Sequence, residues 1–249
     1  MSIGKILFDQ DGQRFYETGV EQCVLFPHTG NAAAPYGSAE ATANVGVAWN
    51  GITSITESPE GADITDLYAD DRKYLTLQAA ENFKATIEAY TYPDEFMACD
   101  GTAELCNGAY FGQQTRKMFA IAYITKEGND IEGNAYGEKL HIIYNCRVAP
   151  SQRQYQTINE SPEAMTFSWE VNTTPISFKD GNKDYTTSIV TVDKKSLEVA
   201  GSQGAAPTYP KWDALIKAIQ GADAEGSDTA ASPSYLPLPA QIKSILTAT

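Results

Sequence analysis

The side chains of this chain that could perform acid–base chemistry occur as adjacent carboxylates. Asp70-Asp71 and Asp94-Glu95 are such pairs, but neither lies beside an apolar run that would bury one carboxyl group and raise its pKa. Both read as solvated turns. Asp9-Gln10-Asp11-Gly12 partly matches a calcium-binding loop, yet the remaining ligand positions and the closing glutamate are missing. The sequence therefore predicts neither acid–base catalysis nor a calcium site.

Cysteine and serine are the other candidate reactive groups. Cys99 and Cys106 have no histidine nearby in the sequence to generate a thiolate. Ser58 and Ser161 precede prolines and lack the Gly-x-Ser-x-Gly elbow of hydrolases. The four cysteines show no CxxC spacing, and the two histidines stand far apart among residues that do not bind metals. We therefore expect no enzyme activity, no metal site and no cofactor.

The charge of the chain limits its partners. The 249 residues carry a formal net charge of −14, and no block of Lys and Arg forms a stripe that could neutralise successive phosphates. Specific recognition of DNA is therefore not expected. Acidity can keep a protein soluble, and an acidic wall would also let a polyanion pass without sticking. No apolar run has the length of a signal peptide or a membrane span, so we expect synthesis in a cytosol and no membrane partner.

Two segments with strand periodicity indicate a mainly β protein. Many Tyr, Phe, Val, Ile and Thr residues favour strands over helices. In residues 81–93, and again in 163–175, apolar and polar residues alternate as in a strand with one buried face. The expected inward residues are Phe83, Ala85, Ile87, Ala89, Met165, Phe167, Trp169 and Val171. The polar positions between them are Lys84, Thr86, Glu88, Thr166, Ser168 and Glu170.

These two segments align at an offset of 82 residues, which suggests an internal repeat. Upstream, 55–60 resembles 158–163 at an offset of 103, so the first copy carries about twenty extra residues near 61–80. This insert has Leu67-Tyr68 and Tyr74-Leu75 around a polar centre, which predicts a hairpin arm with a charged tip. Chance similarity of strand patterns is the alternative to a repeat. A hairpin folded onto its own domain is the alternative to an extended arm.

The remaining chain divides into a β domain, residues 1–200, and a C-terminal segment, residues 201–249. Further strands are expected at 3–8, 20–26, 116–125, 138–148 and 186–192. In the C-terminal segment, Pro210 begins a short helix over 210–220, with Trp212, Leu215, Ile216 and Ile219 at helical spacing. Gly221 ends it. A polar stretch over 223–234, expected to lack fixed structure, precedes an apolar tail.

Several segments resemble the major tail tube proteins of long-tailed phages with non-contractile tails. They occur in the same order and with similar spacing, and together they span most of residues 5–176. The matching pieces are Gly12 to Val20, Trp49 to Ile52, Glu57 to Ala62, Asp66 to Asp70, Ala85 to Phe96, Gly112 to Lys117, Tyr136 to His141, Ser161 to Ala164 and Thr173 to Pro175.

The resemblance implies a β-sandwich or β-barrel with a flanking short helix and an extended arm. Such subunits form hexameric rings that stack into a tail tube, through which DNA passes during ejection without specific binding. The implied partners are other copies of the chain, a tape-measure protein and tube-capping tail proteins. The implied location is the virion tail, after synthesis in the host bacterial cytoplasm.

The two alternating segments would supply the strands that line the channel. We expect them to join edge to edge between subunits, because a closed ring leaves no unpaired strand edge. The lumen-facing side chains would then be Lys84, Thr86, Glu88, Thr166, Ser168 and Glu170. The arm would reach a neighbouring subunit and bury Leu67, Tyr68 and Tyr74 there.

Two other functions fit a sequence of this kind. One is a ring-forming tail terminator or head-completion protein, which has β architecture but does not polymerise. The other is an acidic β-sandwich that binds carbohydrate. That function requires exposed aromatic residues along a groove, whereas Trp49, Trp169 and Trp212 lie in apolar patterns typical of a core.

Overall fold

The chain is mainly β, as the sequence predicted. The computed structural model describes residues 7–155, 157, 164–200, 206–223 and 231–248. Strands account for 46% of the structure and helices for 12%.

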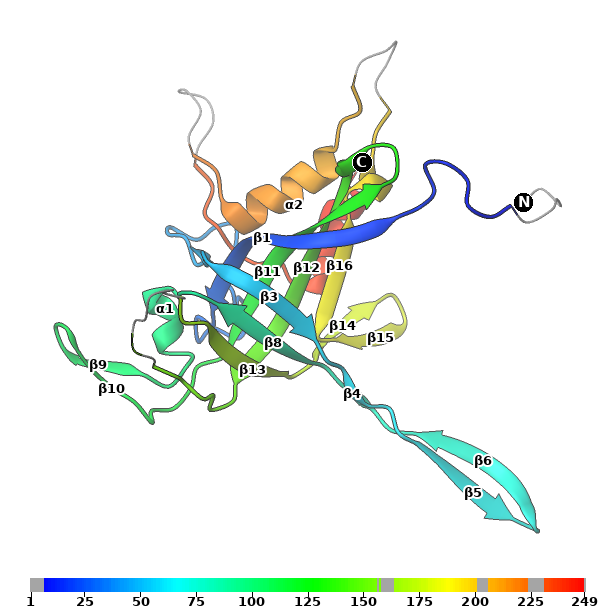
Figure 1. Cartoon of the computed structure of the whole chain (residues 1–249), viewed down its shortest axis with the longest axis horizontal. Coiled ribbons are helices and arrows are strands. Elements are labelled where there is room, and N and C mark those ends of the chain that lie inside the picture. Colours follow the sequence, from blue (N-terminus) through cyan, green and yellow to red (C-terminus); the bar gives the residue numbers. More distant parts are fainter. Residues whose placement is uncertain (1–6, 156, 158–163, 201–205, 224–230, 249) are drawn as a thin grey trace.

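An eight-stranded antiparallel sheet forms the body, with the order β2-β1-β11-β12-β13-β8-β3 and with β16 also paired to β12 (Figure 1). Its strands are β1 (Tyr16–Pro27), β2 (Val47–Ala48), β3 (Ile52–Glu57), β8 (Lys84–Ala89), β11 (Phe119–Asn129), β12 (Gly133–Val148), β13 (Phe167–Thr173) and β16 (Ile189–Asp193).

Short two-stranded ladders and helices complete the fold. The ladders are β4 (Glu60–Gly61) with β7 (Glu81–Asn82), β5 (Ile64–Ala69) with β6 (Arg72–Gln78), β9 (Ala103–Cys106) with β10 (Ala109–Phe111), and β14 (Ile176–Asp180) with β15 (Lys183–Thr187). The helices are α1 (Asp94–Met97), the 3-10 turn η1 (Lys195–Leu197), α2 (Pro210–Gln220) and α3 (Pro239–Thr247).

The large sheet folds back on itself around one apolar core. β3, at one end of the sheet order, comes to lie beside β1 near the other end. Side chains of β1, β11 and β12 pack there against those of β3, β8 and β13. The centre is aromatic: the Trp169 ring lies 5.1 Å from Phe96 and 5.6 Å from Trp49, measured between centroids. This burial holds the two halves of the sheet together.

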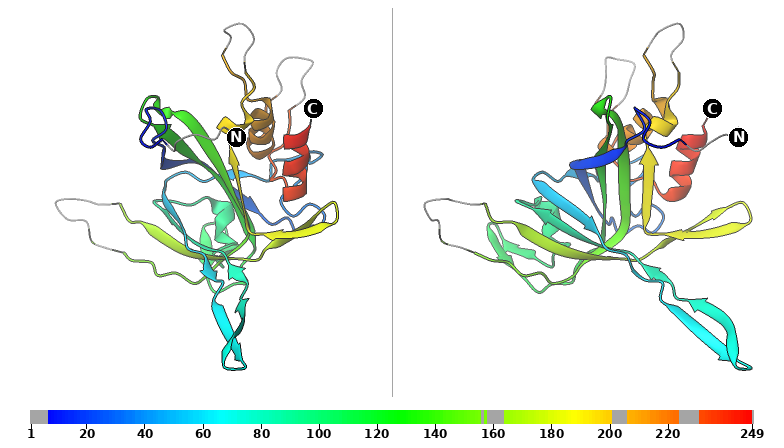
Figure 2. Two further views of the ribbon diagram at one scale, coloured as in Figure 1. Left: turned by 90° about the vertical axis from the view of Figure 1, so that its right-hand side faces the viewer. Right: turned by 45° about the vertical axis from the view of Figure 1, so that its right-hand side comes forward.

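The other face of β1, β11, β12 and β16 is covered by the C-terminal segment. Along β11, Phe119, Ile121 and Tyr123 belong to the first core. Ala120, Ala122 and Ile124 belong to a second core, which also contains residues of α2 and α3. A strand buried on both faces reads as a continuous apolar run, as β11 does. The central strands therefore lie between a second layer of sheet and a layer of helices (Figure 2).

Helix α2 confirms the sequence prediction for residues 210–220. It begins with Pro210 and ends before Gly221, which has a φ of 76°. Trp212, Leu215 and Ile219 are buried. The apolar tail after it contains α3, a helix that the sequence reading did not predict. The tail is tied to the sheet by hydrogen bonds from the Tyr144 hydroxyl to the Pro237 carbonyl (2.7 Å) and from the Leu236 N–H to the Tyr36 carbonyl (3.0 Å).

Several local predictions need correction. The strand predicted at 3–8 falls mostly outside the described residues, and Leu7 and Phe8 belong to no strand. Met165 was predicted to face inward, but β13 begins only at Phe167 and Met165 is 41% exposed. Of the stretch 223–234, residues 224–230 lie outside the described part. Ser234 has a fixed, buried position, contrary to the expectation for the whole stretch.

Candidate assembly surfaces

The outer face of β13, β8 and β3 is polar and forms a regular array. Residues opposite one another on neighbouring strands share a face. Thr86 lies between Glu170 and Thr56, and Glu88 lies between Ser168 and Ser54. A third row pairs Lys84 with Asn172. The opposite face of the same strands carries Ala85, Ile87, Trp169 and Val171 into the core.

Hydrogen bonds and ion pairs order this polar face. The Ser54 hydroxyl donates to Oε2 of Glu88 at 3.0 Å. The Lys84 ammonium lies 2.7 Å from Oε2 of Glu60 and 3.9 Å from Oε1 of Glu170. The hydrogen bond to Glu60 holds the pKa of Lys84 above its usual value, because it favours the charged ammonium. The single lysine thus sits among carboxylates.

The structure brings together five of the six side chains expected to face a channel. Lys84, Thr86, Glu88, Ser168 and Glu170 share the polar face. Thr166 lies before β13 begins and is exposed. Ser54 and Thr56 of β3 complete the face, and sequence reasoning missed both. Their alternation is obscured because the pairing of β3 with β8 shifts register between Ile52 and Ser54.

The expected edge-to-edge pairing of β8 and β13 between subunits is wrong for β8, while the first residues of β13 keep one edge without a partner strand among the described residues. The two strands pair with each other within one chain, from Phe167 opposite Ala89 to Asn172 opposite Lys84. β8 also pairs with β3, so both of its edges are occupied. Among the described residues, β3 has no strand on its other edge. A contact between subunits through these strands would therefore use the edge of β3 or the first residues of β13, which β12 does not reach.

The predicted hairpin is present as β5 and β6, which we call the arm (residues 62–80). Asp70 and Asp71 link the two strands and both have positive φ, 51° and 57°. Positive φ at both turn positions is typical of tight turns that match the twist of paired strands. Aspartate tolerates this conformation better than most residues. The sequence prediction of a hairpin with a charged tip is therefore confirmed.

The arm carries exposed apolar side chains on both faces, because Ile64 and Tyr74 share the face of Asp66 and Thr76. One face bears Leu67 directly opposite Leu75, with Leu77 next along the strand. The other bears Asp66, which accepts a hydrogen bond from the Thr76 hydroxyl (2.9 Å) and pairs with the Lys73 ammonium (2.7 Å). An apolar face on a free hairpin is unfavourable in water.

The arm extends away from the body of its own chain (Figures 1 and 2). The three residues predicted to contact a neighbour are exposed: Leu67 by 42%, Tyr68 by 72% and Tyr74 by 66%. The alternative of a hairpin folded onto its own domain is therefore wrong. Burial of these residues against another subunit stays a prediction.

A second exposed hairpin, β9–β10, was missed by the sequence reading. Leu105 is 73% exposed, Tyr110 53% and Phe111 41%. Cys106 at its tip is exposed, whereas Cys23, Cys99 and Cys146 are buried. The Asn107-Gly108 dipeptide between two short β-prone runs is a hairpin signal that could have found it. This hairpin follows α1 and lies at the end of the sheet away from the arm (Figure 1).

A half-buried histidine joins the end of β3 to the central strands. The His141 ring stacks on Tyr123 at 4.9 Å between centroids. The Tyr123 hydroxyl donates to Oε1 of Glu57 at 2.7 Å, and Nδ1 of His141 lies 3.9 Å from the same oxygen. Burial lowers the pKa of His141, which outweighs the opposite effect of Glu57. This neutral stack fixes β3 against β11 and β12.

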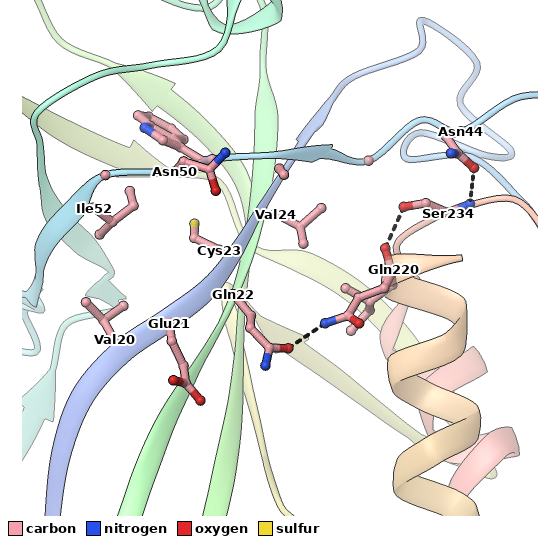
Figure 3. Close-up of a pocket in the computed structure, with 15 residues that line it drawn as sticks. Val20, Glu21, Gln22, Cys23, Val24, Asn44, Asn50, Ile52, Gln220 and Ser234 are labelled. Atoms are coloured by element: carbon pink, nitrogen blue, oxygen red, sulfur yellow. Dashed lines mark hydrogen bonds between the residues drawn. The ribbon is translucent and has the colours of Figure 1, made fainter. Parts of the chain in front are cut away.

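A cavity of about 550 Å³ lies where the folded sheet fails to close, between β1 and the segment of β2 and β3 (Figure 3). Gly19 and Gln22 have positive φ, and register shifts in β1 on both sides of Glu21 bend the strand here. Gln220 of α2 bridges the opening by donating to the Gln22 side-chain oxygen at 2.7 Å. The one carboxylate in the lining, Glu21, pairs with Lys126. The cavity thus offers no acid–base pair.

The buried cysteines are poor nucleophiles. Burial raises the pKa of the Cys23 and Cys99 thiols to about 12, and it also raises the pKa of Cys146. Within the described residues, no group of three or more His, Cys, Asp or Glu side chains is placed to hold a metal ion. None of the helices in the described segments combines the length and apolar character that a membrane-spanning helix requires.

Comparisons with known proteins add no further assignment. The chain matches no protein-family model. No curated protein is significantly similar to it. Its function is therefore inferred from the surfaces described above together with the resemblance of the quoted segments.

Proposed function

We propose that this chain is a tail tube subunit, which polymerises as stacked, hexameric rings into the DNA conduit of a long-tailed phage. The observation that carries the proposal is the arm, a hairpin whose apolar side chains are left uncovered by its own chain. A two-stranded hairpin alone is only marginally stable in water. Contact with another subunit would cover these side chains and hold the arm in place.

The polar face of β3, β8 and β13 is the surface proposed to line the channel. Its side chains are hydroxyls, carboxylates and the Asn172 amide, with Lys84 held in ion pairs. Phosphates would find no free row of cations there, so DNA would slide past this wall without binding to it. The expected lumen residues are Lys84, Thr86, Glu88, Ser168 and Glu170, joined by Ser54 and Thr56.

The fold is compatible with the β-sandwich or barrel, flanking helix and arm that the resemblance implies. The sheet encloses one core, and α2 and α3 cover its other face. The tape-measure protein and the tube-capping proteins are partners that the resemblance implies for such a subunit. The virion tail is the corresponding location.

Purified protein at high concentration should form long tubes in negative-stain electron microscopy. Head-to-tail contacts between unlike surfaces do not close on themselves, so they extend into filaments. Single closed rings without tubes would support the terminator or head-completion alternative instead. A protein that stays monomeric at every concentration would contradict both.

Assembly should hide the polar face from large reagents. In a Cys106→Ser background, Ser168→Cys places the one accessible thiol on this face, because the three remaining natural cysteines are buried. A maleimide coupled to a large carrier protein should label the monomer and fail to label assembled tubes. N-ethylmaleimide, which is small enough to enter a channel, is the matched control and should label both. Equal labelling of monomers and tubes by the large reagent would contradict the assignment of this face.

The three tryptophans offer no surface for the carbohydrate-binding alternative. Trp49, Trp169 and Trp212 are each at most 3% exposed. Stacking on a sugar ring requires an accessible aromatic face, which these three side chains do not offer.

A further inference from the structure

The segment before β1 carries two apolar side chains that the described part of the chain leaves uncovered. Leu7 is 62% exposed and Phe8 is 82% exposed, the largest exposed fraction of any large apolar side chain described. Both residues lie outside any strand. Figure 1 shows this segment, residues 7–15, running out from the body beyond the start of β1. Such side chains are unfavourable in water unless a partner buries them.

Contacts with the β11–β12 hairpin hold the segment in this direction. The Gly12 N–H donates to Oδ1 of Asp130 at 3.0 Å, and Nη1 of Arg14 lies 3.2 Å from Oδ2 of the same carboxylate. The Arg14 guanidinium also donates to the Asp9 carbonyl at 2.9 Å. These anchors direct the apolar end of the segment away from the cavity of its own chain, which lies farther along β1 (Figure 1).

The cavity between β1 and the segment of β2 and β3 has an apolar interior that can take an aromatic ring. Its buried lining residues include Cys23, Val24, Trp49 and Ile219. An apolar cavity of about 150 Å³ holds one benzene ring. The about 550 Å³ present here therefore has room for a phenyl ring and for the backbone that carries it.

The rim of this cavity suits an uncharged, extended peptide. Four carboxamide side chains, each both a donor and an acceptor, belong to the lining: Gln22, Asn44, Asn50 and Gln220. The carboxylate of Glu21 is paired with Lys126 at 3.1 Å, so it does not call for a charged ligand. Among the described residues, the outer edge of β1 has no partner strand from Tyr16 to Gln22. An added strand can pair with such an edge and place alternate side chains in a pocket.

On the basis of the proposed self-assembly, we propose that Phe8 of one copy enters this cavity in a neighbouring copy, while the segment around it pairs with the free edge of β1. The occupant is thus a second copy of this chain, through a contact separate from the arm. Successive residues of an extended chain point to opposite sides, so Leu7 stays outside the cavity. The contact joins two different surfaces and therefore propagates from copy to copy.

The exposed aromatic residues of the β9–β10 hairpin are the other candidates for the cavity. Tyr110 and Phe111 lie in a strand that already pairs with β9. Entry of this hairpin would bring two strands to the edge of β1, whereas the segment before β1 brings one. The free edge of β1 can pair with a single added strand, which favours Phe8.

Disulfide trapping tests this contact in the full-length chain. In a Cys106→Ser background, Leu7→Cys places a thiol beside Phe8 and keeps the phenyl ring. Asn50→Cys or Gln220→Cys places the second thiol on either side of the cavity opening (Figure 3). After mild oxidation of assembled protein, we expect a ladder of dimers, trimers and larger species on a non-reducing gel from at least one of the two pairs.

The control for chance collision is Tyr185→Cys combined with Asn50→Cys in the same background, because Tyr185 lies on the exposed β14–β15 hairpin. Docked thiols have millimolar effective concentration, so the ladder should exceed the product of this control by roughly tenfold. Asn50→Cys with the natural Cys106 retained tests the β9–β10 hairpin as the occupant and should give no more product than the control.

A pair of single substitutions provides a second measurement. Phe8→Ser should raise the protein concentration needed for assembly by at least about tenfold, because burial of the phenyl ring is lost. Leu7→Ser is the matched control, since it removes a neighbouring exposed apolar side chain that stays outside the cavity. It should raise that concentration by less than about threefold. Equal effects of the two substitutions would contradict entry of Phe8.

The outcomes separate this inference from the proposed function. Tubes by electron microscopy together with a ladder support both. Tubes without a ladder from either pair overturn the docking of Phe8 and leave tube formation intact. A disulfide within one chain shows that the segment fills its own cavity, and a ladder through Cys106 shows that β9–β10 fills it; either result overturns the inference. A ladder without tubes supports the contact and overturns the tube.

Discussion

Deletion of the arm should abolish tube formation while leaving the subunit folded. Gly61 lies opposite Glu81 in the β4–β7 ladder, so residues 62–80 can be replaced by Asn-Gly, a sequence suited to a two-residue hairpin turn. The arm extends into solvent, and its large side chains are exposed. Its loss should therefore change the free energy of unfolding by less than about 0.5 kcal/mol. Urea denaturation and electron microscopy of the same preparation measure the two effects.

The matched control keeps the arm and changes only its turn. Replacing Asp70-Asp71 with Asn-Gly preserves the positive φ values that this turn requires and removes two charges. This variant should still form tubes, since the Leu67 and Leu75 side chains remain in place. Tubes of normal yield from the deletion variant would contradict a role for the arm in assembly. A large fall in the free energy of unfolding on deletion would show that the arm contributes to the stability of the sheet, contrary to this prediction.

Truncation of Trp169 to alanine should cause the largest loss of stability among single core substitutions. The side chain is 1% exposed and lies within 5.1–5.7 Å of the rings of Phe96, Trp49 and Phe167, between centroids. Removing it leaves a cavity where the two halves of the folded sheet meet. We expect the free energy of unfolding to fall by about 3–5 kcal/mol, measured by urea denaturation followed by circular dichroism.

Tyr68→Ala is the control for this substitution, because it also truncates an aromatic side chain but one that is 72% exposed. It should change the monomer's stability by about 0.5 kcal/mol or less. A loss of under about 1 kcal/mol for Trp169→Ala would show that the core around it rearranges to fill the space.

The elements that could be predicted are those in which the spacing of apolar residues agrees with the residue types at the turns and helix ends. The alternation in residues 83–89 marked the buried and polar faces of β8, and all four predicted inward residues are buried. In the arm, two β-prone runs around a polar centre were enough to predict a hairpin. Pro210, the helical spacing that follows it and Gly221 marked both ends of α2.

Other elements could not be predicted because their signals are weak or conflict with one another. The register shift in β3 breaks the alternation that would have placed Ser54 and Thr56 on the polar face. The β9–β10 strands are only three and four residues long, too short for a clear period. Helix α3 is only nine residues long and two prolines, Pro237 and Pro239, precede its interior, so the sequence predicted only an apolar tail here.

By itself, the sequence determined which residues of each strand are apolar, where the arm turns and where α2 begins and ends. Only the tertiary structure decided that β8 pairs with β13 inside one chain, that β3 completes the polar face and that the arm is left uncovered. Periodicity is a property of neighbouring residues, so it shows which side of a strand is buried. The choice of partner strand depends on how distant segments fill a common core, and no local pattern records that.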